Sequence, residues 1–325
     1  MGSGTTLLRL MLDSHERIAI PHETGFMRAY NAMQFIPFKW TGRGWAERLG
    51  WKKDDFDGRL REFFDDMFMR YAEDHGKERW GEKTPLHTWH INSMKRVFPD
   101  AVFVAIVRHP GAAVTSSVRR FERPVERAAY HYERYNKEIV RQAEKLPRRM
   151  ILLRYEDLLL RTEPVMRELL AWLGEEWSDA VLEHHVVQGT REHKRVEGKT
   201  RPDESRDPSR ISRWDTTMPE ADREHLSGQV ARLGELFGYS MTDPEALAPL
   251  SETGSLLFGG AEVAERIERF PDLDIRTRMP VPSFEHHYNP RKFRLVPVDE
   301  EPATARSVIR RFTRRRRSPR RRSRA

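Results

Sequence analysis

Four residues near the start of the chain, Ser3, Gly4, Thr5 and Thr6, combine three hydroxyl groups with one glycine. The apolar run LLRLML follows directly, so a buried helix is predicted to begin here. Unpaired backbone N–H groups and the helix dipole at such a start favour an anion, and glycine allows the backbone to approach it closely. The segment therefore predicts a site for a phosphate or sulfate group, with a plain helix start as the alternative.

The anion is not predicted to be a nucleoside triphosphate. The Walker pattern would place a lysine at the position of Thr5, where it contacts the β- and γ-phosphates. In such ATPases a second strand delivers an aspartate for Mg²⁺, whereas here the apolar run 101–107 leads into Arg108. Arg108 and Ser116, eight residues later, could clamp a further phosphate, because arginine offers a bidentate fork. A surface ion pair is the alternative role for Arg108.

No metal site is expected. The chain has no cysteine, which excludes disulfides, thiolate ligands and a cysteine nucleophile. The histidine pairs His87/His90 and His184/His185 lack a third ligand at a suitable spacing. Mg²⁺ is not implied either, because both positions that hold it in an ATPase carry other residues.

Two continuous apolar runs, 101–107 and 150–153, are rich in the residues of buried parallel strands. A shorter strand is predicted at 18–20, and residues 163–173 form a helix that Gly174 ends. Strands that alternate with helices predict an α/β fold: a P-loop NTPase-like parallel sheet flanked by helices.

The other segments carry weaker patterns. Residues 26–79 are expected to form helices and loops rather than sheet, and the polar stretch 191–214 a long loop of the kind that often forms a lid. Residues 219–237 are expected to form a final amphipathic helix. Residues 240–305 show little periodicity.

Charge divides the chain unevenly. Its net charge is +8, but residues 306–325 alone hold eleven arginines and no acidic residue, so the remainder is mildly acidic. We therefore expect an α/β domain over 1–240, an extension of unknown role over 241–305 and a disordered basic tail over 306–325. The tail is either simply solvated or contacts an anionic surface such as nucleic acid or acidic lipid.

Targeting signals are not recognised. The N-terminus lacks the basic, apolar and small-residue regions of a signal peptide, and the chain has no run of about 18 apolar residues. The expected compartment is the cytoplasm, with no transmembrane segment.

The chain resembles the sulfotransferases that use 3′-phosphoadenosine 5′-phosphosulfate (PAPS), in the style of bacterial and tyrosylprotein-type members. The similarity runs from Ser3 to about Tyr239. It rests on short segments in the family's order: Ser3–Thr6, Pro21–Thr24, Glu82–Pro85, Arg108–Ser116, Tyr155–Asp157 and Arg213–Trp214. Each segment is a weak signal by itself, and their shared order and spacing make the resemblance strong.

The resemblance implies a set of residues that bind the cofactor: Ser3, Gly4, Thr5 and Thr6 for the 5′-phosphosulfate, Arg108 and Ser116 for the 3′-phosphate, Tyr155 near the adenine and Arg213 in the closing loop. Lys199 in the same loop is a further candidate. For Tyr155, an ordinary place in the core is the alternative.

The same resemblance implies the catalytic residues. Glu23 is expected to be the general base, and Lys83 to stabilise charge on the transferred sulfuryl group and the leaving phosphate. His22 is the alternative base, but neighbours on an extended chain point to opposite faces, so only one of the two can serve.

One departure from the family concerns the start of the chain. Members usually carry lysine or arginine directly before S-G-T-T, preceded by an apolar strand, whereas this chain has Gly2 there. We expect that the natural protein begins upstream, so that the first strand of the sheet is truncated in this sequence. A chain that is whole but impaired is the alternative.

The predicted function is in-line transfer of a sulfuryl group from PAPS to a hydroxyl or amine on a small molecule, carbohydrate or peptide. Two alternatives belong to other classes. One is a P-loop kinase acting on a small molecule, against which Thr5 and Arg108 argue. The other is a nucleic-acid-binding protein that acts through the arginine-rich tail.

Overall fold

The computed structural model describes residues 2–34, 43–189, 207–243, 245–251 and 254–277. Met1–Met279 cluster into one unit, to which every structural statement below refers. The second unit, Pro280–Ala325, holds the predicted basic tail and lies outside the described residues. Lys199 and most of the predicted polar loop also lie outside them.

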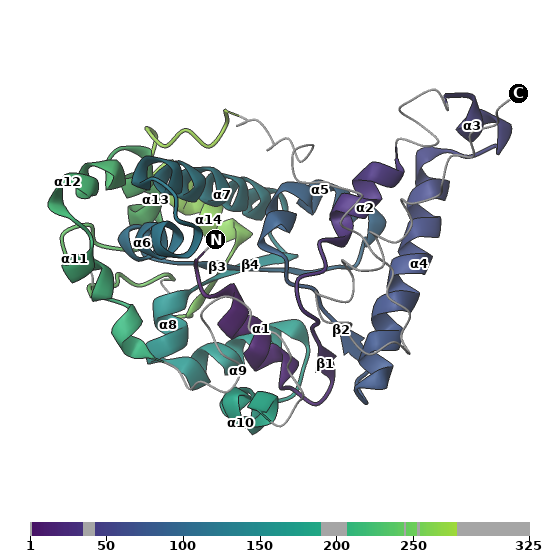
Figure 1. The fold of residues 1–325 in the computed structure, drawn as a ribbon, viewed down its shortest axis with the longest axis horizontal. Helices are drawn as coiled ribbons and strands as arrows, with labels where there is room; N and C mark the ends of the chain where they lie inside the picture. Colours follow the sequence, from purple (N-terminus) through teal and green to yellow (C-terminus); the bar gives the residue numbers. More distant parts are fainter. Residues whose placement is uncertain (1, 35–42, 190–206, 244, 252–253, 278–325) are drawn as a thin grey trace, which may run out of the picture. The chain divides into compact units, whose positions relative to one another are not determined.

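Two parallel strands form the centre of the structure, β3 (Phe103–Val107) and β4 (Met150–Arg154) (Figure 1). Their register pairs Phe103 with Met150 and Val107 with Arg154, so both strands end at the same edge. A third strand, β5 (Leu257–Gly259), pairs antiparallel with the other side of β4. The two apolar runs of the sequence are therefore parallel strands, as predicted, and they are neighbours in the sheet.

Alternate residues of these strands face two separate cores. Ala105 and Val107 of β3 pack with α6 (Pro110–Phe121), α7 (Val125–Lys145), α13 (Gln229–Leu236) and α14 (Gly260–Glu268). Ile106 packs on the opposite face with α1 (Thr5–Asp13), α8 (Tyr155–Leu160) and α9 (Thr162–Leu173). Figure 1 shows these two groups of helices on either side of β3 and β4. Burial on both faces explains why the strands are apolar at almost every position, because helices cover most of their side chains. Arg154, which ends β4, is the charged exception and is itself buried.

Fourteen α-helices have described bounds: α1 (Thr5–Asp13), α2 (Phe26–Met33), α3 (Arg43–Arg48), α4 (Lys53–Asp74), α5 (Ile91–Val97), α6 (Pro110–Phe121), α7 (Val125–Lys145), α8 (Tyr155–Leu160), α9 (Thr162–Leu173), α10 (His184–Gly189), α11 (Arg213–Thr217), α12 (Glu220–Arg223), α13 (Gln229–Leu236) and α14 (Gly260–Glu268). Short 3₁₀ helices lie at Pro85–His90 (η2), Asp179–Val181 (η3), Pro208–Arg210 (η4) and Glu224–Leu226 (η5). Among the described residues, none of these helices has the length and apolar character needed to cross a bilayer.

A second, two-stranded sheet pairs β1 (Ile18–Ala19) with β2 (Arg79–Trp80) in parallel. Within the described residues, β2 and β3 do not pair with each other. Residues of both strands instead line a cavity of about 510 Å³, called here the larger cavity. Its lining is mainly apolar and also includes Ser3, Thr5 and Lys83.

Three local expectations from the sequence were wrong. The predicted helix 219–237 is broken into α12, η5 and α13, and Gly228, with a positive φ of 58°, separates η5 from α13. The last residue of the segment 26–79 belongs to β2, a strand that consists of Arg79 and Trp80 and is not part of an apolar run. The end of the predicted loop 191–214 is also helical, since it holds η4 and the first residues of α11.

The segment 240–305 contributes to the core despite its weak periodicity. Its described part supplies β5 to the sheet and packs α14 against α7. Gly260 allows the close approach of that helix, since a Cβ there would lie 2.0 Å from the carbonyl oxygen of Ala143. The α/β class, with parallel strands covered by helices, is confirmed.

Candidate functional site

The loop before α1 requires glycine at position 4. Gly4 adopts a φ of 92°, and a Cβ on it would lie 2.2 Å from Cδ2 of Tyr155. No side chain caps the start of α1 in place of a ligand, and the backbone N–H groups of its first turn have no partners within the helix. A helix start of this kind suits an anion, and the anion site at Gly4, Thr5 and Thr6 stays a prediction.

Arg108 follows the last residue of β3 and reaches this loop. Its Nη1 donates to the carbonyl oxygen of Gly2 and its Nη2 to that of Arg210, each at 2.8 Å. The guanidinium lies 4.4 Å from the centre of the Tyr155 ring, a cation–π distance. Only 8% of the residue is exposed, and its Nε has no hydrogen-bond partner among the described residues. A buried guanidinium with an unused donor suits an anionic ligand.

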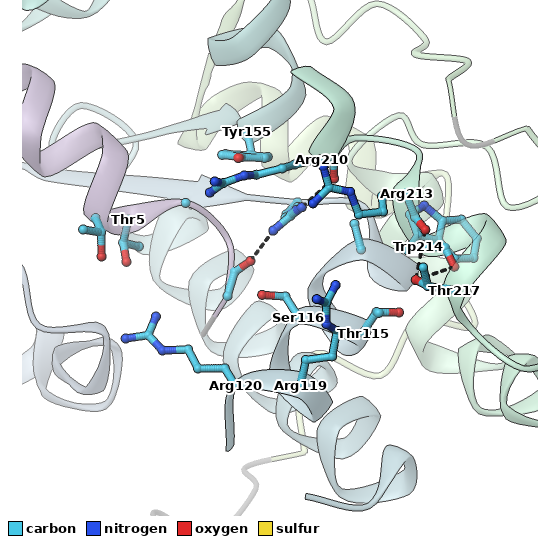
Figure 2. A pocket seen from close by; sticks show the side chains of 15 residues that line it. Thr5, Thr115, Ser116, Arg119, Arg120, Tyr155, Arg210, Arg213, Trp214 and Thr217 are labelled. Carbon is cyan, nitrogen blue, oxygen red and sulfur yellow. Dashed lines mark hydrogen bonds between the residues drawn. The ribbon is translucent and has the colours of Figure 1, made fainter. Parts of the chain in front are cut away.

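A cavity of about 210 Å³, called here the basic cavity, opens between the loop, β3 and α6. Figure 2 shows side chains from the loop, α6, the start of α8 and the segment 210–217 around it. It is lined by five arginines: Arg108, Arg119, Arg120, Arg210 and Arg213. Among the described residues no carboxylate belongs to the lining, so the cavity favours a ligand that carries more than one negative charge.

Gly2 lies between Ser116 and Arg108. A Cβ on Gly2 would lie 3.2 Å from Oγ of Ser116, and the carbonyl oxygen of Gly2 accepts the bond from Arg108. Both predicted clamp residues thus line the basic cavity, with Gly2 between them.

Arg213, which the resemblance assigns to the closing loop, also lines the basic cavity, and Asp207 forms an ion pair with it. Asp207 Oδ2 lies 3.3 Å from Arg213 Nη2 and 3.1 Å from Arg210 Nε. Hydrogen bonds from Ser209 and from the Arg210 guanidinium lower the pKa of Asp207, so this carboxylate stays charged. A ligand phosphate would compete with Asp207 for the two arginines.

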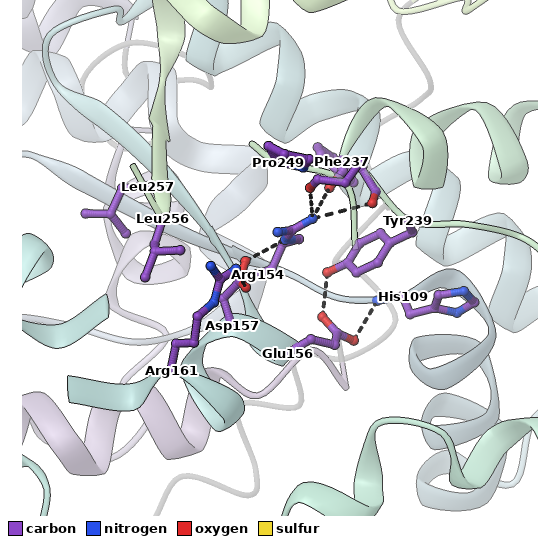
Figure 3. Close-up of polar contacts among 12 residues, drawn as sticks. His109, Arg154, Glu156, Asp157, Arg161, Phe237, Tyr239, Pro249, Leu256 and Leu257 are labelled. Atoms are coloured by element: carbon purple, nitrogen blue, oxygen red, sulfur yellow. Dashed lines mark hydrogen bonds and ion pairs between the residues drawn. The ribbon is translucent and has the colours of Figure 1, made fainter. Parts of the chain in front are cut away.

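Polar contacts fix the turn at His109, the residue after Arg108, and Figure 3 shows Glu156 between His109 and Tyr239. Glu156 is fully buried and accepts hydrogen bonds from the backbone N–H of His109 at 3.1 Å and from the Tyr239 hydroxyl at 2.6 Å. Burial raises the pKa of Glu156. Its neighbour Asp157 pairs at 2.6 Å with the buried Arg154. In the motif Tyr155–Asp157, therefore, the tyrosine faces the site while the two acids anchor the backbone.

His109 caps α6. Its Nδ1 accepts from the Gly111 N–H at 3.1 Å, so the proton lies on Nε2, which donates to the Ser240 carbonyl oxygen at 3.0 Å. Burial lowers the pKa of His109 to about 4, and the Arg108 charge acts in the same direction. The ring stacks on Trp214 at 4.7 Å between centroids. The neutral imidazole thus connects α6, α11 and the chain after α13.

The two predicted catalytic residues are in direct contact. Lys83 Nζ lies 2.6 Å from Glu23 Oε1, and the side chains are 13% and 42% exposed. Lys83 lines the larger cavity together with Ser3 and Thr5, and Thr5 also lines the basic cavity. The start of α1 therefore lies between the basic cavity and the wall that carries Lys83.

Sequence reasoning did not single out Arg119, Arg120 or Arg210. For the first two a signal was present, because they follow Ser116 by three and four residues and so share its face of α6. Arg210 had no such signal, since it enters the cavity from a segment remote in sequence. The prediction of no metal stays a prediction, and among the described residues no group of three potential ligands converges.

Comparison with known proteins adds to this geometry. The sequence model of the sulfotransferase family matches residues 2–179, more than half of the chain. A putative protein-tyrosine sulfotransferase of Caenorhabditis briggsae is 25% identical over 197 residues, covering 58% of this chain and 67% of that protein. Protein-tyrosine sulfotransferase 1 of Danio rerio is 26% identical over 201 residues, covering 58% and 54%. The chain thus spans about half to two thirds of the length of these relatives.

A solved structure shares the fold. The sulfotransferase domain of the Synechococcus PCC 7002 olefin synthase superimposes with a TM-score of 0.52 at 19% identity. The match covers 74% of this chain and 92% of that domain. The likeness establishes the P-loop-like arrangement of strands and helices predicted from the sequence.

Proposed function

Because the chain belongs to the sulfotransferase family, whose members are transferase enzymes, we propose that it transfers a sulfuryl group from PAPS to an acceptor hydroxyl. The observation that carries this proposal is the basic cavity beside the glycine loop. A nucleotide with phosphates at both the 3′ and 5′ positions matches two separate groups of anion-binding residues there.

The residues assigned to the donor divide between its two ends. Ser3, Gly4, Thr5 and Thr6 would hold the 5′-phosphosulfate through hydroxyls and backbone N–H groups. Arg108 and Ser116 would hold the 3′-phosphate, with Arg213 closing from the opposite side. Tyr155 and Trp214 line the same cavity and offer aromatic surface for the adenine. When bound, PAPS supplies an activated sulfuryl group and the bisphosphate leaving group.

Glu23 and Lys83 act at the reacting end. Glu23 would take the proton of the acceptor hydroxyl. The oxygen of that hydroxyl would bond to sulfur while the bond between sulfur and the phosphate oxygen breaks, and the bisphosphate would leave. Lys83 places its ammonium where negative charge develops on the sulfuryl oxygens and the leaving phosphate. The 42% exposure of Glu23 lets it release the proton to water afterwards.

A hydroxyl is the preferred acceptor group, and an amine is the alternative. The two relatives described above carry names that specify protein tyrosine, whose side chain ends in a hydroxyl. The class of acceptor molecule that we propose is a small molecule, a carbohydrate or a peptide. PAPS as the donor and Glu23 as the base are parts of this proposal.

Thermal unfolding in the presence of nucleotides tests the proposal. Adenosine 3′,5′-bisphosphate should raise the melting temperature more than AMP or ATP at equal concentration, because only it carries the phosphate assigned to Arg108 and Ser116. Equal stabilisation by AMP would contradict the assignment of Arg108 and Ser116 to a 3′-phosphate. Preferential stabilisation by ATP with Mg²⁺ would instead support a kinase.

A further inference from the structure

Glu82 directly precedes Lys83 and has no role in the reaction described above. Its side chain is only 6% exposed. It accepts hydrogen bonds from the backbone N–H of Thr24 at 3.1 Å, the Thr24 hydroxyl at 2.8 Å and the Thr84 hydroxyl at 2.6 Å. His87 Nδ1 lies 2.7 Å from its other oxygen. Four donors thus converge on one buried carboxylate.

The two threonines extend this cluster to the start of α2. The Thr84 hydroxyl accepts from the Gly25 N–H at 3.2 Å, and the Thr24 hydroxyl accepts from the Phe26 N–H at 3.3 Å. Gly25 itself has no side chain to cap the helix. The negative charge of Glu82 therefore reaches the unpaired N–H groups of α2 through two hydroxyls.

Glu82 is unsuited to act as a base. Burial by itself would raise its pKa, but hydrogen bonds from His87, Thr84 and Thr24 outweigh burial, and its pKa lies below the ordinary value. Its oxygens are already engaged by donors, so no acceptor proton can reach them. Of the two glutamates near Lys83, only Glu23 is open to a substrate.

The position of the cluster links it to the reacting pair. Thr24 follows Glu23 in the chain, and Glu82 precedes Lys83, so each bond between Thr24 and Glu82 joins the two segments that carry that pair. The contact between Glu23 and Lys83 itself lies at the more exposed edge. Small displacements of groups that must meet a reacting centre are costly, of the order of 100-fold for about 1 Å.

We propose that Glu82 is a positioning residue, which holds the segments 23–25 and 82–84 together so that Glu23 and Lys83 face the same acceptor. This inference rests on the roles assigned to Glu23 and Lys83 in the proposed function. A merely structural role, in which Glu82 only stabilises the start of α2, is the competing interpretation.

The test uses Glu82→Gln, which keeps the shape of the side chain but removes its charge. Glu168→Gln is the matched control, because Glu168 is also a partly buried carboxylate that accepts from a hydroxyl, Ser255, and a backbone N–H, Leu256, away from the site. We expect kcat to fall at least 10-fold in Glu82→Gln, with the affinity for adenosine 3′,5′-bisphosphate changed less than twofold. Glu168→Gln should leave both unchanged.

A second readout does not need a known acceptor. The lysines are labelled with ¹³C-methyl groups for NMR, and the Lys83 signal is assigned as the one that Lys83→Arg removes. The quantity measured is the change in chemical shift of this signal, called its displacement, that Glu23→Gln causes. It is recorded in the otherwise native protein and again in the Glu82→Gln protein. Positioning predicts that Glu82→Gln reduces this displacement at least by half. An unchanged displacement overturns the proposal, even if the melting temperature falls. A protein that binds bisphosphate but transfers no sulfuryl group refutes the proposed function and leaves this readout valid.

A milder pair of variants covers the case in which Glu82→Gln fails to fold. Thr24→Val removes one hydroxyl that donates to Glu82, whereas Thr88→Val removes a neighbouring hydroxyl that donates to the Pro85 carbonyl instead. Thr24→Val should reduce the displacement of the Lys83 signal and Thr88→Val should not. Equal responses of the two variants would contradict the positioning role.

Discussion

Arg108 makes several contacts in the candidate site. Arg108 stacks on Tyr155, holds the Gly2 and Arg210 carbonyl oxygens and still has an unused buried donor. A bound 3′-phosphate would replace neutral carbonyl oxygens with charged ones, which form stronger hydrogen bonds with a guanidinium. In the proposed function, Arg108 would therefore be preorganised by contacts that a phosphate can exchange.

Replacement of Arg108 by lysine tests this exchange. Arg108→Lys should weaken binding of adenosine 3′,5′-bisphosphate by about 10- to 100-fold, because a single ammonium cannot form the bidentate contact. Binding of AMP should change little, as measured by calorimetry. Arg167→Lys is the control, since Arg167 likewise stacks on an aromatic ring, that of Trp177, outside the site. An equal loss for AMP would contradict a role specific to the 3′-phosphate.

The general base is tested by Glu23→Gln. Loss of a positioned base should lower kcat about 100- to 10,000-fold, while bisphosphate binding stays nearly intact. Glu163→Gln provides a control, because Glu163 is a comparably exposed carboxylate that pairs with Arg167. If Glu23→Gln keeps most of the wild-type kcat, Glu23 is not the general base. His22→Ala would then test the alternative base.

At the scale of elements, the site is assembled where strands end and helices begin. β3 and β4 are parallel and in register, so Arg108 and Tyr155 emerge side by side after Val107 and Arg154. The start of α1 packs onto the Tyr155 ring at Gly4. The glycine is therefore required both by its backbone angle and by the ring beneath it.

Gly4→Ala tests this packing. A Cβ at Gly4 has no room against Tyr155 and is strained at a φ of 92°, so the variant should lose about 1–3 kcal/mol of the free energy of unfolding. It should also lose bisphosphate binding. Gly58→Ala is the matched control: Gly58 lies within α4 with nothing within 4 Å of its Cβ position, and alanine should stabilise that helix by about 0.5–1 kcal/mol. Urea unfolding measures both, and a Gly4→Ala protein of unchanged stability would contradict the close packing.

At the scale of the whole described unit, the chain after α13 returns to support the site. β5 completes the three-stranded sheet, and Arg154 donates to the Ala248 carbonyl oxygen at 2.8 Å. His109 reaches the Ser240 carbonyl oxygen, so the cap of α6 depends on this returning segment. The motif that presents Arg108 is thereby coupled to the stability of the unit.

This coupling predicts a dependence of stability on pH. The pKa of His109 is near 6.5 in the unfolded chain and about 4 in the folded protein. The unfolded chain therefore binds a proton first, so the free energy of unfolding should fall as the pH decreases from 6.5 to 4. The full loss from this group is about 3 kcal/mol. Glu156, whose pKa burial raises, acts in the opposite direction.

His109→Asn isolates the contribution of His109, because asparagine can cap α6 but does not titrate. The stability of this variant should depend less steeply on pH between 6.5 and 4. Part of the slope should remain, since burial also lowers the pKa of His90 and His131 to about 4. Equal slopes in the two proteins, measured by urea unfolding at several pH values, would contradict the neutral buried state of His109.

Prediction from sequence succeeded where local patterns were strong. The strands at 103–107 and 150–154 are apolar at almost every position, and Gly174 ends α9 with a φ of 75°. It failed at β2 and β5, which have two and three residues and gain their stability only from neighbouring strands. Short strands carry too few side chains to establish a period of two.

Local motifs in the sequence were enough to select Gly4 and Arg108 as candidate site residues, because the geometry of a glycine loop before a helix and of an arginine after a buried strand is set by neighbouring residues. The sequence also determined the α/β class, through the apolar runs. Three features became visible only in the folded chain: Arg119, Arg120 and Arg210 share one cavity with Arg108, Glu82 rather than Glu23 is the buried acid, and the chain after α13 joins the core. These features depend on contacts between segments far apart in sequence, and burial and partners of a charged side chain arise only when those segments meet.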